Sequence, residues 1–190
     1  MGIEVTRARQ RASAFATRFI AAALCTLLGA APLLPDQSAS ERLEYSVKAA
    51  FLLNFTKFVD WPQTAFVDGE APFHICIYGP DPFGRVLHDV VRGETAMGRR
   101  LVIRHISQPA SPRTCQIVFI AGASRERIAE VAGPGVLTVG EGDRFVRDGG
   151  AIAFIVDKHR VRFDISQSAA ETAGLKLSSK LLSVARSVEK

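Results

Sequence analysis

The residues best suited to acid–base chemistry in this 190-residue sequence are its histidines and one pair of acids. The histidines are scattered along the chain, at His74, His88, His105 and His159. Glu141 and Asp143 follow an apolar run typical of a β-strand, a position where α/β proteins often carry active-site loops. The motifs of nucleotide-binding loops, serine hydrolases and zinc proteases do not occur in the sequence.

We therefore predict a protein that is not an enzyme, with no catalytic, cofactor-binding or metal-binding residues. The enzymatic alternative is a hydrolase that uses His105 or His159 with the loop of Glu141 and Asp143. That alternative requires these groups to meet in one cleft.

The N-terminal segment has the pattern of a secretory signal peptide. Four arginines, Arg7, Arg9, Arg11 and Arg18, precede an uncharged apolar run over residues 19–31 that ends in small residues. The run is shorter than the roughly 20 residues of a transmembrane helix. We predict a signal peptide over 1–31 that is cleaved near Ala31, a linker over 32–40 and one periplasmic domain over 41–190. The alternative is an uncleaved membrane tether.

The net charge of +5 belongs mostly to this segment. Removing its four arginines and one glutamate from the 24 basic and 19 acidic residues leaves 20 and 18, a net charge of +2. A charge this small gives little attraction to phosphate backbones, so we predict no nucleic-acid binding. Hydrophobic residues make up 47% of the sequence and charged residues 23%, which indicates a folded globular domain.

Cys76 and Cys115 are the two cysteines of the predicted exported domain. Export to an oxidising compartment favours a disulfide between them. No CxxC or HxxxH spacing lies near either residue, so a zinc site is not expected. We predict the Cys76–Cys115 disulfide, with two buried free thiols as the alternative.

Alternating strand and helix patterns predict an α/β fold: a single domain with a mixed β-sheet, flanking helices and an antiparallel hairpin near the C-terminal end. A helix over 41–59 would place an aromatic stripe in the core, formed by Val47, Phe51, Phe55 and Phe58. Strands are expected at 73–78, 101–106, 115–121 and 136–139. Helices are expected at 83–91, capped by Asp81, and from Ser124, which caps it, to about 132. The hairpin strands are 151–156 and 160–165, followed by helices at 169–173 and 178–188.

Several motifs occur in order between about residue 45 and residue 185. They are the aromatic helix ending at Trp61-Pro62, Asp81-Pro-Phe-Gly84, Gly98-Arg99, Cys115-Gln-Ile-Val-Phe-Ile120, Val136-Leu-Thr-Val139, Gly149-Gly150, Val161-Arg-Phe163, Ala173-Gly-Leu175 and Ser178-Ser-Lys-Leu-Leu182. No single motif is specific, but the ordered set resembles the YfiR-like family of periplasmic signalling proteins.

The resemblance implies a periplasmic domain that regulates a membrane partner. Members of the family are associated with repression of an inner-membrane diguanylate cyclase, which lowers cyclic-di-GMP and biofilm formation. The partner implied is the periplasmic sensor region of such a cyclase, and a homodimer is left open. Related domains are joined to sensor kinases, so a small-ligand sensor for a histidine kinase is the alternative. Some members carry a second cysteine pair after the first, which this sequence lacks.

A regulatory surface is expected to carry exposed arginine or aromatic anchors. Arg160 and Arg162 form the polar face of the second hairpin strand, and Lys180 and Arg186 lie on the predicted last helix. We predict that these two sets bind the partner. The alternative for each is an ordinary solvated face.

Overall fold

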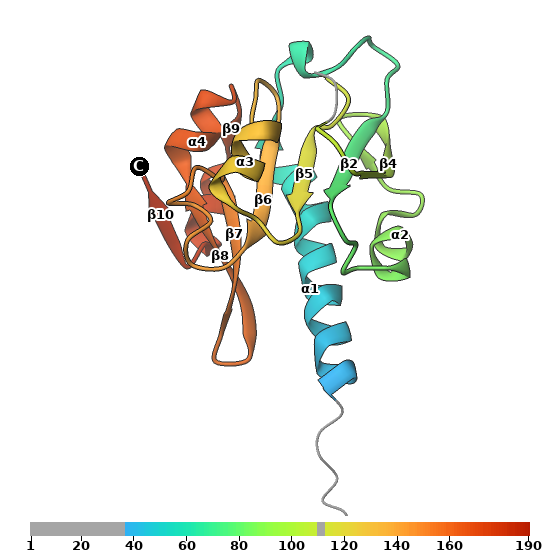
Figure 1. The fold of residues 1–190 in the computed structure, drawn as a ribbon. Helices are drawn as coiled ribbons and strands as arrows, with labels where there is room; N and C mark the ends of the chain where they lie inside the picture. Colours follow the sequence, from blue (N-terminus) through green and yellow to red (C-terminus); the bar gives the residue numbers. More distant parts are fainter. Residues whose placement is uncertain (1–36, 110–112) are drawn as a thin grey trace, which may run out of the picture. The chain divides into compact units, whose positions relative to one another are not determined.

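The helices and strands of residues 37–109 and 113–190, as described by a computed structural model, form a sheet with helices on both faces (Figure 1). The helices are α1 (Gln37–Phe58), η1 (Gln63–Ala65, 3-10), α2 (Arg85–Val91), α3 (Arg125–Val131), α4 (Gln167–Thr172) and α5 (Ser179–Val184). The strands are β1 (Val59–Asp60), β2 (Phe73–Tyr78), β3 (Thr95–Ala96), β4 (Arg99–Ile106), β5 (Ile117–Ile120), β6 (Leu137–Glu141), β7 (Ile152–Asp157), β8 (Arg160–Ser166), β9 (Lys176–Leu177) and β10 (Ser187–Glu189). These residues also form one compact unit, so the predicted single α/β domain is confirmed.

The main sheet of the described residues has eight strands in the order β10-β8-β7-β6-β5-β2-β4-β3. Strands β4, β2, β5, β6 and β7 run parallel to one another. Strand β8 is antiparallel to β7, which confirms the predicted hairpin, and β10 is parallel to β8. The central strands are apolar on both sides because helices cover both faces of a parallel sheet.

Alternating side chains of the strands enter two apolar layers. One layer contains Ile77 and Phe119 together with residues of α1, α2 and α5. The other contains Cys76 and Val118 together with Ile128 of α3. Because successive strand residues point to opposite faces, the short apolar runs of the sequence supply both layers. In the described ranges, none of the helices is long and apolar enough to cross a membrane.

Helix α1 is buried along its second half only. Phe51 and Phe55 pack against Phe154, with ring centroids 6.1 and 5.9 Å apart, as the predicted stripe requires. Val47 belongs to the same stripe but is 37% exposed, so its predicted burial is wrong. The helix extends past the carboxyl ends of the parallel strands at this point (Figure 1), and the described residues offer no apolar surface to cover it.

Several predicted element boundaries differ from the structure. Helix α1 begins at Gln37 rather than at 41, while residues 1–36, including the predicted signal peptide, lie outside the described residues. Asp81 does not cap α2, which follows Gly84; its carboxylate accepts a hydrogen bond from the Phe83 amide instead. Ser124 does cap α3 as predicted, accepting from the Arg127 amide.

The predicted last helix over 178–188 is also shorter. Helix α5 ends at Val184, and residues 187–189 form β10 beside β8. The Arg186 amide donates to the Phe163 carbonyl, and the Arg186 side chain binds Asp164. These bonds hold the chain in an extended conformation and outweigh the helical propensity of the segment.

Candidate functional site

The carboxyl edge of the parallel strands contains the position where open α/β sheets commonly bind ligands. Strand β2 has β4 on one side and β5 on the other, so this switch point lies between the loops after β2 and β5. The Tyr45 ring lies edge-on to Phe83 at 5.4 Å, and Phe83 lies edge-on to Phe119 at 4.8 Å. On the other face, the Arg127 guanidinium lies 4.3 Å from the centre of the Tyr78 ring and donates to the Tyr78 carbonyl. The protein's own side chains therefore occupy this position.

The described residues line one pocket beside this position and another away from it. One, of about 280 Å³, adjoins Tyr45 and Phe83 between the start of α1 and the segment before α2. That volume is below the roughly 300–1,000 Å³ typical of small-molecule sites. The other, of about 480 Å³, lies between the end of α3 and α4, and its small and hydroxyl-bearing lining residues include no ionisable group. Among the described residues, no histidine lines either pocket.

The groups of the hydrolase alternative do not come together. His105 Nε2 lies 2.9 Å from Asp81 Oδ2, and the His105 ring stacks on His88 with centroids 6.1 Å apart. Through the strand registers, His105 on β4 is in line with Val139 on β6, three strands or about 14 Å away. His159 lies in the turn of the hairpin, between β7 and β8. Across the described ranges, no three His, Cys, Asp or Glu residues are arranged to hold a metal ion.

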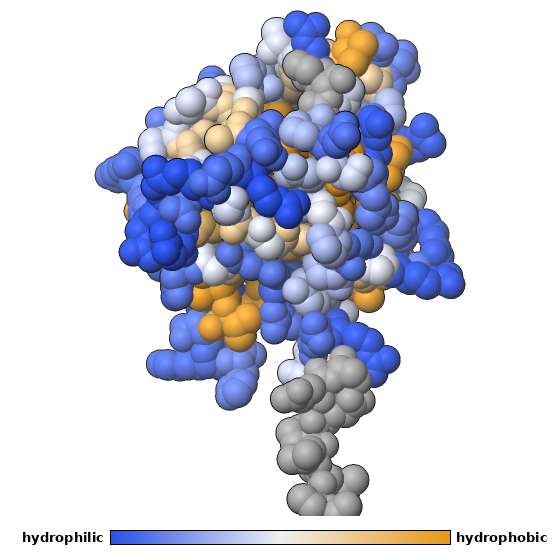
Figure 2. All heavy atoms as spheres, in the orientation of Figure 1, coloured by the Kyte–Doolittle hydropathy of each residue, from blue (hydrophilic) through white to orange (hydrophobic). Residues whose placement is uncertain are grey.

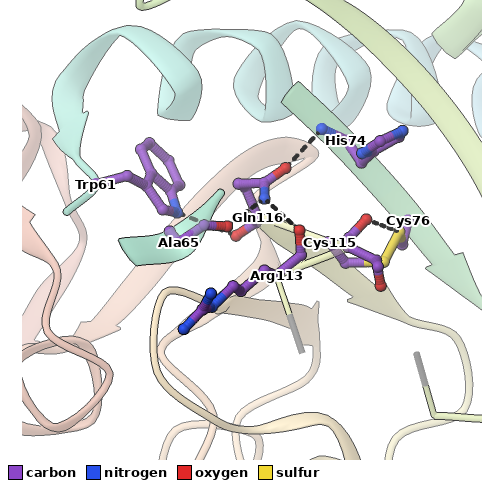
Figure 3. The surroundings of a disulfide bond; sticks show 8 residues. Trp61, Ala65, His74, Cys76, Arg113, Cys115 and Gln116 are labelled. Atoms are coloured by element: carbon purple, nitrogen blue, oxygen red, sulfur yellow. Dashed lines mark hydrogen bonds between the residues drawn. A yellow bond between two sulfur atoms is a disulfide. The ribbon is translucent and has the colours of Figure 1, made fainter. Parts of the chain in front are cut away.

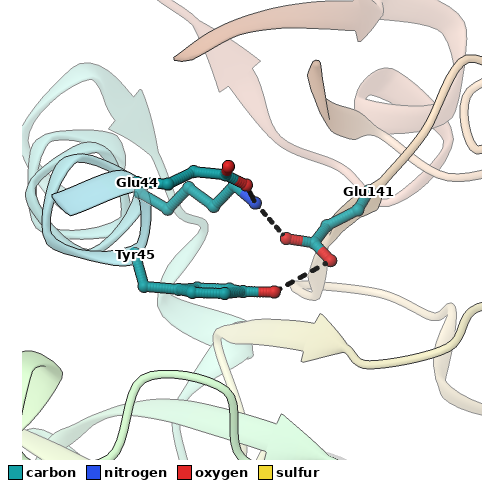
Figure 4. A network of polar contacts seen from close by, with 4 residues as sticks. Glu44, Tyr45 and Glu141 are labelled. Atoms are coloured by element: carbon teal, nitrogen blue, oxygen red, sulfur yellow. Dashed lines mark hydrogen bonds and ion pairs between the residues drawn. The ribbon is translucent and has the colours of Figure 1, made fainter. Parts of the chain in front are cut away.

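Glu141 instead anchors α1 to the sheet through a buried lysine (Figure 4). The Lys48 side chain is 4% exposed and forms ion pairs with Glu44, one turn earlier on α1, and with Glu141 at the end of β6. The Tyr45 hydroxyl donates to the second oxygen of Glu141 at 3.5 Å, and the Lys48 ammonium lies 4.3 Å from the centre of the Tyr45 ring. The network joins residues almost one hundred positions apart, and sequence spacing gave no signal for it beyond the Glu44–Lys48 pair.

The charges of this network determine its protonation. Burial lowers the pKa of Lys48, but its hydrogen bonds to Glu141 and Glu44 raise it by more, so the pKa lies above the ordinary value. Burial, followed by the charge of Glu141, raises the pKa of Tyr45. Lys48 is therefore a cation and Tyr45 a neutral phenol at physiological pH, which makes the network an electrostatic clamp and not an acid–base pair.

The predicted disulfide between Cys76 and Cys115 is confirmed (Figure 3). It joins Cys76, in the middle of β2, to Cys115, two residues before β5, and both cysteines are buried. Gln116, whose role was not predicted, makes further contacts beside the disulfide. Its side chain accepts from the His74 amide and donates to the Ala65 carbonyl, at 2.8 and 2.7 Å, and its carbonyl accepts from the Trp61 indole at 3.2 Å.

The four predicted partner-binding residues differ in their surroundings. Arg160 and Arg162 are exposed on β8, and Lys180 is exposed on α5. Arg186 donates two hydrogen bonds to Asp164 and one to Asp143, at 3.0 Å for the latter. The hydrogen bonds from Arg186 lower the pKa of Asp164 against the opposing effect of its burial. Arg186 is therefore committed to the fold, while Arg160 and Arg162 extend along the same face of β8 toward the hairpin turn.

Together, the filled switch point and the scattered histidines and acids define an α/β domain in whose described residues the groups of the hydrolase alternative do not meet. Comparison with protein families matches residues 45–186 to the YfiR/HmsC-like family. The chain belongs to this family, as its ordered motifs predicted.

Two further comparisons, with curated proteins and with solved structures, do not identify a function. No curated protein matches the chain. Among solved structures, a conserved domain protein from Vibrio cholerae O1 biovar El Tor strain N16961 is similar, with a TM-score of 0.47 and 12% sequence identity. The similarity covers 76% of this chain and 60% of that one.

Proposed function

We propose that the protein is a periplasmic, non-catalytic regulator that binds the periplasmic region of an inner-membrane diguanylate cyclase and holds the cyclase inactive. Membership of the YfiR/HmsC-like family is the observation that carries the proposal, because regulation of such cyclases is associated with this family. The occupied switch point supports a binding role. Arg160 and Arg162 are the proposed anchors, because they are exposed and free of the ion pairs that hold Arg186.

Repression by binding sets a physical requirement on the partner. A regulator that binds the active and inactive forms equally shifts nothing. Moving the cyclase from a 1:99 to a 99:1 ratio requires about 10⁴-fold tighter binding to the inactive form. The surface must therefore contact a part of the cyclase that differs between its two forms.

The test is deletion of the gene, with cyclic-di-GMP measured in strains that contain or lack the candidate cyclase. We expect deletion to raise cyclic-di-GMP only where the cyclase is present, and crosslinking in the periplasm to recover that cyclase. Unchanged cyclic-di-GMP in both backgrounds, with no cyclase recovered, would remove the proposal. Recovery of a histidine kinase instead would favour the sensor alternative, for which the neutral pocket beside α4 is the ligand-sized cavity.

Export is proposed from the sequence pattern of residues 1–31. Mass spectrometry of the periplasmic protein is expected to give a chain that begins near residue 32. A chain that retains Met1, or that stays with the membrane, would contradict cleavage near Ala31.

A further inference from the structure

Two segments project past the carboxyl edge of the sheet, on either side of Glu141. The first, the α1 arm, is Gln37–Val47, the part of α1 that precedes Lys48. The second, the hairpin arm, is Ile155–Arg162, the part of β7 and β8 beyond Phe154, which is the register partner of Glu141. Figure 1 shows both arms extending in the same direction. Figure 2 shows open space between them, with hydrophobic atoms on the hairpin above its hydrophilic tip.

The sides of this cleft continue an apolar face of the core. At its base, Phe51 of α1 packs against Phe154 and Phe163, with centroids 6.1 and 5.2 Å apart. Val156 lies two residues beyond Phe154 on the same face of β7, and Val47 lies one turn before Phe51 on α1. These two side chains are 52% and 37% exposed. The apolar stripe therefore extends beyond the last residues that cover it, on both arms at once.

The hairpin arm also offers a strand edge. Strand β6 pairs with β7 only as far as Phe154, so in the described part of the chain no strand lies beside Ile155–Asp157 on that side. An unpaired edge beside an apolar face is the arrangement to which an extended peptide adds as a further strand.

The exposed charges of the hairpin arm are mainly positive. Three bases, Lys158, Arg160 and Arg162, stand against one acid, Asp157. On the α1 arm, Glu41 and Arg42 have opposite charges, and Glu44 is paired with Lys48. The positive charge of the hairpin arm thus favours an acidic partner segment.

The turn of the hairpin arm is not the one that stability alone would select. Lys158 and His159 have φ angles of 47° and 61°, the left-handed conformations of a two-residue hairpin turn. Asn-Gly adopts these angles with less strain, whereas Lys and His do so at some loss of stability. Strain of this kind is concentrated at functional sites, so the side chains of the turn are themselves candidates for contact.

We propose that the cleft between the α1 arm and the hairpin arm binds an extended, acidic segment of the partner, which adds as a strand beside Ile155–Asp157. The inference rests on the proposed function, since the partner is the periplasmic region of the cyclase. Apolar residues of the segment cover Val47 and Val156, and its carboxylates lie near Lys158 and Arg160.

A protein segment fits the cleft better than a second copy or a lipid surface does. In a symmetric pair of copies the two hairpin arms would meet with like charges, which opposes association. A flat bilayer would contact the tip, whose residues from Asp157 to Arg160 are all polar, and would leave the apolar sides of the cleft uncovered.

The test uses the full-length gene in the deletion strain and the purified periplasmic region of the cyclase that crosslinking recovers. Val47→Glu and Val156→Glu place a carboxylate on each side of the cleft, and Arg160→Glu reverses a charge at its rim. Met97→Glu and Arg100→Glu are matched controls, because both residues are exposed at the β3–β4 edge of the sheet. Circular dichroism melts establish that all five variants fold.

We expect each cleft variant to bind the periplasmic region about tenfold more weakly or worse, and each control to remain within about twofold of the parent. Short overlapping peptides of the cyclase region are expected to locate binding in a segment with several acids, and salt at about 1 M is expected to weaken it. Full repression by folded Val47→Glu and Val156→Glu overturns the cleft while the proposed function stands. A binding peptide that is neutral or basic equally overturns the proposal. So does loss of self-association or loss of binding to phosphatidylglycerol vesicles in these variants, because the cleft then binds a second copy or a lipid surface. If deletion leaves cyclic-di-GMP unchanged, the proposed function fails first.

Discussion

The disulfide between Cys76 and Cys115 closes a loop that contains α2, β3 and β4, with a sequence separation of 39 residues. Cross-linking a chain stabilises the fold mainly by reducing the entropy of the unfolded state. For a loop of this length the chain-entropy relation gives about 4 kcal/mol at 25 °C. Replacing both cysteines by alanine also removes two buried sulfur atoms, because Cys76 and Cys115 are 0% and 3% exposed. We therefore expect the free energy of unfolding to fall by about 4–5 kcal/mol.

Urea denaturation of the purified protein under non-reducing conditions measures this change. The fluorescence of Trp61 is a suitable signal, because the indole is buried and donates to the Gln116 carbonyl next to the bridge. With a urea dependence of about 2 kcal/mol/M, the midpoint is expected to move down by about 2 M. Adding reductant to the parent protein should reproduce most of the shift. Val118→Ala, in the same apolar layer, is the control for lost packing and is expected to remove only about 1–2 kcal/mol.

Three results would refute this reasoning. A loss below about 1 kcal/mol in the double variant means that the loop is already constrained in the unfolded chain. Two thiols that react in the unfolded, unreduced parent mean that the bridge does not form in the protein at all. An unchanged parent in reductant, with a destabilised double variant, would assign the effect to packing.

Three further predictions concern the charged network and the hairpin. Lys48→Met should lower the free energy of unfolding by about 2 kcal/mol in the same urea assay. This is less than the roughly 3–5 kcal/mol of a fully buried pair, because the two carboxylate partners of Lys48 are about one-third exposed. The control Lys57→Met, at an exposed pair, should change the free energy of unfolding by under about 1 kcal/mol. Because its folded pKa is lowered, Asp164 stabilises the fold above its ordinary pKa of 3.8, and this contribution is lost as the pH falls further. The stability difference between the parent and Asp164→Asn should therefore be constant above about pH 5 and shrink in acid; a difference that persists unchanged to low pH contradicts the assignment. Replacing Lys158-His159 by Asn-Gly should raise the free energy of unfolding by about 1–2 kcal/mol while weakening partner binding. A less stable variant would show that the Lys158-His159 turn is unstrained.

The sheet and its covering helices were predictable because local patterns specify them. The mostly apolar run from 115 to 121 indicated a central strand, and β5 within it is hydrogen-bonded on both sides. Ser124 and the alternation along β8 likewise have local signatures, a cap and a period of two. The family followed from the order of such motifs and not from any one of them.

Features that depend on distant residues were not predictable. The spacing of Val47 and Phe51 places them on one stripe, but only the sheet's extent determines where burial stops. Arg186 has helical neighbours in sequence, and the position of Asp164 decides that the helix ends before it. Lys48 is an ordinary i,i+4 partner of Glu44 on the sequence alone; Glu141 makes it a buried clamp.

The clamp explains how a projecting helix arm can act as one wall of a binding cleft. At 22 residues α1 is about 33 Å long, and Tyr45, against Phe83, is the aromatic contact of its first half, whereas Phe51 and Phe55 pack the second half into the core. An uncovered helical segment of that size is marginal in water. Lys48 lies at the boundary between the two halves and holds both the turn before it, through Glu44, and the end of β6, through Glu141. Glu141 is in turn paired in the sheet with Phe154, at the base of the hairpin arm. The contact between Lys48 and Glu141 thus determines the spacing of the two arms, and a partner segment need not touch it.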